Sequence, residues 1–152
     1  MENKAQLGEK SLKKLRNPSQ SAFGVIQVTL VYFKKVVVET LLIHARELHP
    51  REGILLLRGK TEKGNIVVED TLIPPFATYG RGFSSFPLHM IPIDFSIIGT
   101  AHSHPSGSPY PSIEDLNKFY GKIMVIVAFP YKSERNIAVF NREGEKMSFQ
   151  VI

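Results

Sequence analysis

A short apolar run that ends in two histidines constrains the fold of this chain more than any other part of its sequence. Residues 95–98 begin an apolar stretch that predicts a buried strand, and the stretch continues to His102 and His104. Residues two apart in an extended chain point to the same side. The two imidazoles can therefore face a single point in space at the end of the strand.

The segment after the histidines predicts a loop and then a helix. Prolines and a glycine interrupt residues 105–111, which excludes regular structure there. We interpret Ser103, Ser106 and Ser108 as loop formers and not as nucleophiles, because no acid–base partner is evident near them. Ser112 is followed three residues later by Asp115, and this spacing is that of a capping box at the start of a helix. Asp115 would then lie in the first turn of the helix, where its carboxylate can face back toward the strand.

Two imidazole nitrogens and one carboxylate oxygen form a set of three ligands with an open fourth position. Catalytic zinc sites have this arrangement, whereas structural zinc sites have four protein ligands. The chain has no cysteine, so any metal site in it must use His, Asp or Glu. Each part also has an ordinary explanation, because paired histidines occur by chance and a capping box alone would account for Ser112 and Asp115.

Residues 102–115 as a whole resemble the signature of the JAMM (MPN-domain) metalloproteases, His-Ser/Thr-His-x7-Ser-x2-Asp, which is complete here. That family has a further catalytic glutamate upstream, in a segment similar to Pro-x-Glu-x-x-Gly-x-Leu-x-Gly. Leu55 stands where the family usually has glycine, a departure that concerns local packing more than chemistry. The resemblance spans about residues 22–150. Residues 50–59 match the upstream segment at Glu52, Leu57 and Gly59.

The resemblance implies a single Zn²⁺ held by His102, His104 and Asp115. It implies Glu52 as general base and Ser112 as a hydroxyl donor to the oxyanion. The implied substrate is an amide or isopeptide bond after the C-terminal Gly-Gly of a ubiquitin-like protein or sulfur carrier. The chain looks most like small stand-alone archaeal members, so we expect a deubiquitinase-like (iso)peptidase.

Residues 74–87 are rich in proline, glycine and aromatic side chains. They correspond in the resemblance to the first insertion of the MPN fold, a segment beside the active site that grips the substrate. The alternative is a loop whose aromatic rings pack into the core, since long loops have either role. The candidate substrate-binding residues are Phe76, Tyr79, Phe83 and Phe86.

Hydrophobic periodicity predicts an α+β fold for residues 21–152. We expect helices over residues 34–48 and 113–120 and a turn over residues 130–134. His49 ends the first helix, because the residue before a proline leaves the helical region. The expected strands cover residues 22–32, 53–58, 66–73, 96–100, 122–129, 135–141 and 146–152, and residues 88–93 lead toward the metal-binding run. The second and third of them would form one hairpin and the last two another. The prediction is a single MPN domain with a curved, mixed, mostly antiparallel sheet and flanking helices, and the resemblance implies cytidine-deaminase-like layering.

Charge and hydropathy limit the location and partners of the chain. The formal net charge is +5, and basic residues cluster in residues 1–20, which we expect to be a flexible tail. No aromatic residues interleave with these charges for base stacking, so we expect solvent contact rather than nucleic-acid binding. No apolar run approaches the ~18 residues of a membrane span, and no signal-peptide core is present. This predicts a cytoplasmic protein without membrane contact.

Three other functions stay open. Two histidines and a carboxylate also form the facial triad of iron(II) oxygenases, although such a site would not need Glu52. A non-catalytic MPN scaffold would pair with an MPN-type partner, although scaffold members have usually lost metal ligands that this chain retains. A nucleic-acid role for the basic tail would show as DNA binding that weakens steeply with salt. A homodimer also stays open.

Overall fold

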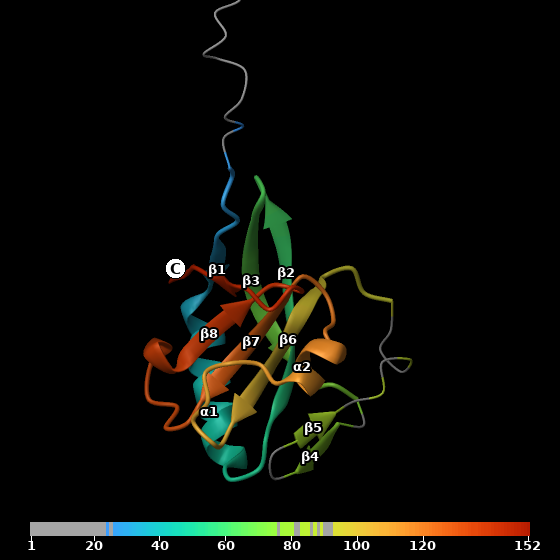
Figure 1. Ribbon diagram of the computed structural model, residues 1–152, viewed down its shortest axis with the longest axis vertical. Helices are drawn as coiled ribbons and strands as arrows, with labels where there is room; N and C mark the ends of the chain where they lie inside the picture. The colour runs from blue at the N-terminus through green and yellow to red at the C-terminus, as the bar shows by residue number, and fades with distance from the viewer. Residues whose placement is uncertain are drawn as a thin grey trace, which may run out of the picture.

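An eight-stranded sheet forms the centre of the protein (Figure 1). The computed structural model describes residues 24, 26–75, 77–80, 83–85, 87, 89 and 93–152, with only the backbone described for residues 78, 79 and 83–85. The strands are β1 (Val31–Phe33), β2 (Ile54–Glu62), β3 (Asn65–Leu72), β6 (Ile97–His104), β7 (Ile123–Ala128), β8 (Ile137–Phe140), β9 (Lys146–Met147) and β10 (Phe149–Val151). Their order in the sheet is β10-β1-β3-β2-β6-β7-β8-β9.

The sheet is mixed and mostly antiparallel, as expected. β1 runs parallel to β3 and β10, and β6 runs parallel to β7. The β2–β3, β2–β6, β7–β8 and β8–β9 pairs are antiparallel. β6, which ends in the two histidines, lies in the middle of the sheet, and all of its residues are buried.

Helices cover both faces of the sheet. α1 (Lys35–Leu48) buries a stripe of apolar residues in the larger core cluster, whereas α2 (Ile113–Asn117) lies beside the smaller one. The residues of β7 alternate between the two clusters, with Val125 in the larger and Met124 and Ile126 in the smaller. Both faces of β7 are therefore buried, and a strand buried on both faces has a continuous apolar sequence and not an alternating one. The result is the layered α+β arrangement that we expected.

The chain end corrects one prediction and nearly closes the sheet. Residues 135–141 and 146–152 were expected to form one hairpin, yet only β9 pairs with β8, and β10 pairs with β1 on the opposite edge. The backbone N–H of Val31 donates to the carbonyl of Ser148, the single residue between β9 and β10. The Phe149 ring packs edge-on against Phe33 at 5.5 Å between ring centroids, which favours pairing of β10 with β1.

The first strand is shorter than predicted. The alternation over residues 22–32 gave a strand, but β1 begins only at Val31, and residues 22, 23 and 25 lie outside the described residues. Val31 pairs with Ile66 in β3, and Ile66 is only the second residue of β3, which begins at Asn65. The preceding residues therefore run past the end of their partner strand and form no ladder. Val28 is accordingly 65% exposed despite its apolar side chain.

The hairpin of β2 and β3 is confirmed and is longer than predicted. Its turn is formed by Lys63 and Gly64, with φ values of 50° and 80°. A two-residue turn with positive φ at both positions matches the twist of the flanking strands. β2 therefore continues to Glu62 instead of ending at residue 58. Leu55, the departure from the family pattern, is buried in the larger core cluster.

Both predicted helices are present, and the second is shorter than predicted. α2 ends at Asn117 rather than at residue 120, because Phe119 turns inward to pack in the smaller core cluster. Residues 134–136, expected as part of a turn and the start of a strand, form a short 3₁₀ helix, Glu134–Asn136. None of the helices in the described chain is long and apolar enough to cross a membrane.

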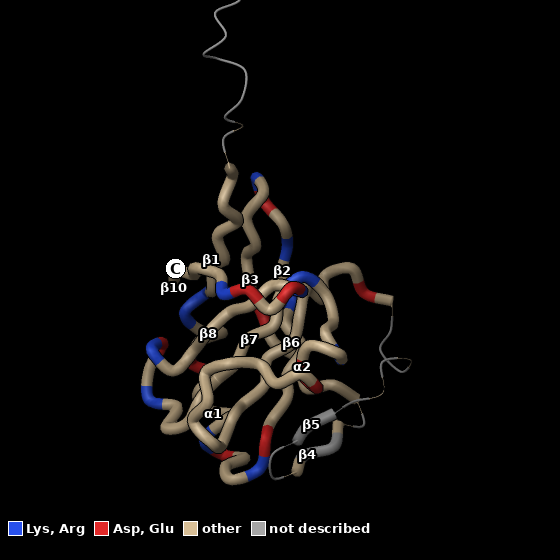
Figure 2. Tube along the Cα trace, viewed as in Figure 1, with Lys and Arg blue, Asp and Glu red and all other residues tan. Residues whose placement is uncertain are grey.

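Charged side chains are spread over the described surface. Figure 2 shows Lys and Arg on several separate segments, interspersed with Asp and Glu. On the outer face of the sheet, Glu69 lies 3.7 Å from both Lys34 and Lys60. The basic tail predicted at residues 1–20 lies outside the described residues.

Candidate metal centre

Pairing between β2 and β6 brings Glu52 to the two histidines. Ile54 pairs with His102 in antiparallel register, and the chain continues from there toward Glu52 and His104. The N–H of Ser103 donates to the carbonyl of Gly53 at 3.0 Å, and the N–H of Gly53 donates to the Ser103 hydroxyl at 2.7 Å. These two hydrogen bonds fix the glutamate beside the end of β6.

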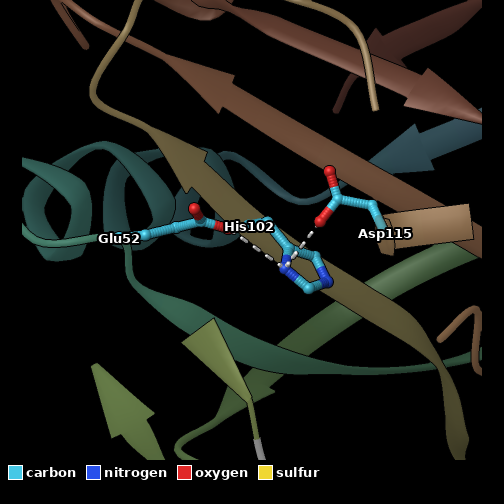
Figure 3. Close-up of side chains that lie close together, drawn as sticks. All are labelled: Glu52, His102 and Asp115. Atoms are coloured by element: carbon cyan, nitrogen blue, oxygen red, sulfur yellow. Dashed lines mark ion pairs between the residues drawn. The ribbon is translucent and has the colours of Figure 1, made fainter. Parts of the chain in front are cut away.

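The side chains of Glu52, His102, His104 and Asp115 converge in a buried site, where each of these residues as a whole is at most 9% exposed. His102 Nδ1 lies 3.8 Å from Glu52 Oε1 and 3.9 Å from Asp115 Oδ1. Figure 3 shows the two carboxylates directed at this nitrogen from either side of the ring. His104 Nε2 lies 3.2 Å from Asp115 Oδ2. Glu52, His102 and Asp115 each offer one ligand atom within 4.8 Å of the others, so they could share a metal ion.

The start of α2 orients Asp115 through the predicted capping box. The N–H of Ser112 donates to Asp115 Oδ2 at 2.7 Å, and the N–H of Asp115 donates to the Ser112 hydroxyl at 3.0 Å. The second bond uses a lone pair of the Ser112 oxygen and not its hydroxyl hydrogen. One hydroxyl would be expected to serve either the helix cap or a bound oxyanion. Here the oxygen of Ser112 accepts the capping bond and its hydrogen stays available to an oxyanion, so the two roles do not compete.

Neighbouring polar groups orient both imidazoles. His104 Nδ1 lies 3.0 Å from the carbonyl oxygen of Ser108, so Nδ1 carries the hydrogen and a neutral ring presents the lone pair of Nε2 to Asp115. His102 Nε2 lies 3.2 Å from the hydroxyl of Thr100. Partners of this kind fix the tautomer and orientation of metal-binding histidines.

The electrostatics of the site favour a cation. Burial would lower the pKa of His104, but the hydrogen bond with Asp115 and the charges of Asp115 and Glu52 raise it overall. Burial would raise the pKa of Asp115, but hydrogen bonds from His104 and Ser112 and the charge of His102 lower it well below its usual range. Two imidazole nitrogens and a carboxylate in one buried place form the donor set of a catalytic zinc ion, so these residues fit that metal.

The site opens to solvent through a pocket of about 540 Å³. This volume lies within the roughly 300–1,000 Å³ of sites that hold ligands or substrate segments. Its floor is formed by the four convergent side chains, and the exposed Tyr110 lies on its wall. The rest of the wall includes Pro50, Pro105, Pro111, Glu114 and Lys118.

The predicted substrate-binding residues cannot be placed. Phe76 and Phe86 lie outside the described residues, as do the side chains of Tyr79 and Phe83. The backbone of their segment forms a two-stranded sheet of β4 (Thr78–Gly80) and β5 (Phe83–Ser85). The N–H of Glu52 donates to the carbonyl of Gly80 at 2.6 Å, so β4 lies next to the site.

Two supporting residues were missed or misread in the sequence. Ser103 was interpreted as a loop former, but it lies in β6, is 4% exposed and accepts the hydrogen bond from Gly53. Thr100 was not singled out. Thr100 could have been found by extending the strand alternation, because it lies two residues before His102 and on the same face of the strand. Ser106 and Ser108 do lie in the loop, where Ser108 N–H donates to the Ser106 hydroxyl.

Comparisons with known proteins agree on one family. The family model described as prokaryotic homologs of the JAB domain matches residues 34–142. A probable metalloprotease of Haloferax volcanii is 32% identical over 113 residues, which cover 70% of this chain and 70% of that protein. The matched family region contains Glu52, both histidines and Asp115.

Solved structures agree with this result. A JAB1/MPN domain protein from Archaeoglobus fulgidus is 32% identical, with a TM-score of 0.61, over 80% of this chain and 98% of that one. A structure described as JAMM, a metalloprotease-like zinc site in the proteasome and signalosome, is 31% identical with a TM-score of 0.58. That match covers 82% of this chain and 99% of the other.

Proposed function

The chain belongs to the JAMM (MPN-domain) family, and from this premise we propose that it is a zinc-dependent peptidase that cuts the amide or isopeptide bond after the C-terminal Gly-Gly of a ubiquitin-like protein or sulfur carrier. The observation that carries the proposal is the convergence of His102, His104 and Asp115 with Glu52 in one buried pocket. A fold alone does not determine function, so the argument rests on these side chains.

His102, His104 and Asp115 are the proposed zinc ligands. They supply the two nitrogens and one oxygen that catalytic zinc sites use, and they leave a further position open. When bound, zinc lowers the pKa of a coordinated water from about 16 to about 7 and polarises a carbonyl oxygen. Thr100 and the carbonyl of Ser108 hold the imidazoles in place for this role.

Glu52 is the proposed general base. Glu52 is 6% exposed, and its Oε1 lies 3.8 Å from His102 Nδ1, so the carboxylate would be within reach of a water activated by a metal on the proposed ligands. The carboxylate takes a proton from the attacking water and returns it to the leaving amine. The same position would also allow Glu52 to act as a ligand, and the Glu52→Gln variant distinguishes the two roles.

Ser112 is the proposed oxyanion donor. Its hydroxyl oxygen accepts the N–H of Asp115, which leaves the hydroxyl hydrogen to donate. Removal of one such donor costs about 10²–10³ in turnover where it has been measured. Donation to the developing oxyanion would stabilise the transition state more than the substrate.

The proposed substrate segment is an extended, narrow peptide tail. The β4 backbone lies beside Glu52 and brings a strand to the edge of the site. An extended tail recognised by strand addition obtains its affinity from main-chain hydrogen bonds. The Phe76, Tyr79, Phe83 and Phe86 side chains, from the same segment, are proposed to contact the modifier.

The test is cleavage of a ubiquitin-like protein fused through its Gly-Gly tail to a second protein. Three samples are compared: zinc-loaded wild type, wild type treated with a chelator, and zinc-loaded Glu52→Gln. We expect cleavage after Gly-Gly by the first sample alone. Absence of cleavage by wild type that contains zinc would contradict the proposed peptidase activity, and activity that depends on iron(II) instead of zinc would favour an oxygenase-type site.

A further inference from the structure

A buried tyrosine, Tyr131, contacts the connection between α1 and β2, which contains Glu52. Tyr131 follows β7 and is 1% exposed. Its φ of 56° is unusual for a bulky residue and is maintained only where the surroundings hold the backbone. Its N–H donates to the carbonyl of Ala128 at 3.0 Å, and its carbonyl accepts a hydrogen bond from Arg46 of α1 at 2.5 Å. The position of Tyr131 is therefore fixed from two sides.

The Tyr131 hydroxyl contacts His49, the residue that ends α1. The hydroxyl oxygen lies 3.1 Å from His49 Nδ1. The His49 ring stacks on Phe129 at 4.8 Å between centroids and with 24° between planes, and it meets the Tyr131 ring edge-on at 5.6 Å. Phe129 and Tyr131 also contact each other edge-on at 5.7 Å. We call His49, Phe129 and Tyr131 the ring cluster.

The ring cluster joins two parts of the site. His49 lies three residues before Glu52 in the α1–β2 connection. The backbone N–H of Phe129 donates to the carbonyl of His104 at 3.1 Å. Burial raises the pKa of Tyr131, and the charge of Glu52 raises it further. The side chain is therefore a neutral hydroxyl at neutral pH, and it lies close enough to the Glu52 carboxylate to interact with its charge.

We propose that the Tyr131–His49 hydrogen bond positions Glu52 for proton transfer. The proposal rests on the proposed function and adds two positioning residues, His49 and Tyr131, which are outside the set of proposed zinc ligands. The short segment between His49 and Glu52 transmits any shift of the imidazole to the carboxylate. A displacement of about 1 Å at a reacting group can cost about 100-fold in rate. A single hydrogen bond that holds His49 in place can therefore affect the rate of proton transfer by Glu52.

The test uses four variants and one control variant of the full chain, all loaded with zinc. Tyr131→Phe removes the hydroxyl and keeps the ring, and His49→Phe keeps the stacking and removes Nδ1. His49→Asn retains a hydrogen-bonding nitrogen near the Nδ1 position. The double variant combines both phenylalanines. Tyr32→Phe, which removes a hydroxyl on the outer face of the sheet, is the matched control.

We expect Tyr131→Phe and His49→Phe each to lower kcat by about tenfold, the usual scale for supporting partners of a metal site, with KM and zinc content unchanged. His49→Asn should restore most of the rate. The double variant should be no slower than the slower single variant, because the hydroxyl acts only through His49. A kcat for Tyr131→Phe within twofold of wild type would overturn the proposal, and so would multiplicative losses in the double variant.

A second measurement does not depend on activity. The Glu52 N–H donates to the Gly80 carbonyl, so its hydrogen–deuterium exchange reports whether the connection stays in place. In chelator-treated protein we expect this amide to exchange about tenfold faster in Tyr131→Phe than in Tyr32→Phe, in line with the loss in kcat. If zinc-loaded wild type cleaves nothing, the proposed function fails, and unchanged exchange in Tyr131→Phe would separately overturn the positioning role.

Discussion

The Nε2 atom of His104 lies 3.2 Å from Oδ2 of Asp115, and only 10% and 11% of the two side chains are exposed. Because His104 Nδ1 donates to the Ser108 carbonyl, a neutral ring turns a lone pair toward an ionised carboxylate. Two electron-rich atoms this close in a buried place are stable only with a cation between them. Burial would lower the pKa of His104, but the hydrogen bond with Asp115 and the charges of Asp115 and Glu52 raise it overall, so this place favours a proton on the ring or a zinc ion in its stead.

Asp115→Asn should therefore lose zinc. The amide oxygen can still accept from Ser112 N–H, so the cap at the start of α2 is retained, while the charge that binds the metal is removed. We expect zinc affinity to fall at least 100-fold and turnover to disappear with it. Zinc content after dialysis and the thermal midpoint measure the two effects. Asp70→Asn, which changes an exposed carboxylate of β3, is the control, and full zinc occupancy in Asp115→Asn would exclude Asp115 as a ligand.

Glu52→Gln should keep zinc and the fold but lose turnover. The amide is nearly isosteric with the carboxylate and cannot take a proton, so kcat should fall by about 10²–10⁴ with little change in zinc affinity. Parallel measurement of zinc content and of cleavage of the Gly-Gly fusion checks both. Loss of zinc from this variant would instead assign Glu52 as a ligand, and near-normal cleavage would remove it from the mechanism.

The strand–loop–helix that carries the metal centre was predictable because its signals are local. Alternation placed His102 and His104 on one side, and the Ser112–Asp115 spacing placed the carboxylate in the first helical turn. The capping box and the contacts between these side chains confirm that local geometry. The assignment of each residue's role rests on the family pattern and stays a proposal.

Features that depend on distant partners could not be predicted. The start of β1 depends on where β3 begins, and the separation of β9 from β10 depends on the opposite edge of the sheet. The contact between His49 and Tyr131 joins residues 82 apart in the chain, and no periodicity in either segment signals it. His49 was interpreted only as the end of a helix, a role that it does have.

His44 should make the stability of the chelator-treated protein depend on pH. Burial lowers the pKa of His44, and the charge of Glu47 offsets this only in part. A histidine with a lowered folded pKa stabilises the fold fully above its unfolded pKa of about 6.5. That stability is lost as pH falls through the folded value, because the unfolded chain then binds more protons.

The comparison is wild type against His44→Gln, both unfolded by urea between pH 5 and 8. The advantage of wild type over the variant should be smallest at low pH and should increase toward pH 8. The contribution of His104 has the opposite sign and is common to both proteins, so it cancels in the difference. A difference that is independent of pH, or that increases toward pH 5, would contradict the burial of a neutral His44.

Ser112→Ala should lower stability and turnover by separate routes. Loss of the oxygen that accepts Asp115 N–H removes the cap and should cost about 1 kcal/mol of unfolding free energy. Loss of the hydroxyl hydrogen removes the proposed oxyanion donor and should lower kcat by about 10²–10³ while zinc stays bound.

Ser112→Gly and Ser112→Thr separate the two effects. Glycine caps a helix only a few tenths of a kcal/mol less well than serine but has no hydroxyl, so Ser112→Gly should keep most of the stability and still lose turnover. Threonine retains both the acceptor and the donor and should keep most of both. If kcat in Ser112→Gly stays near that of wild type, Ser112 is a cap alone, and the oxyanion must be stabilised without it.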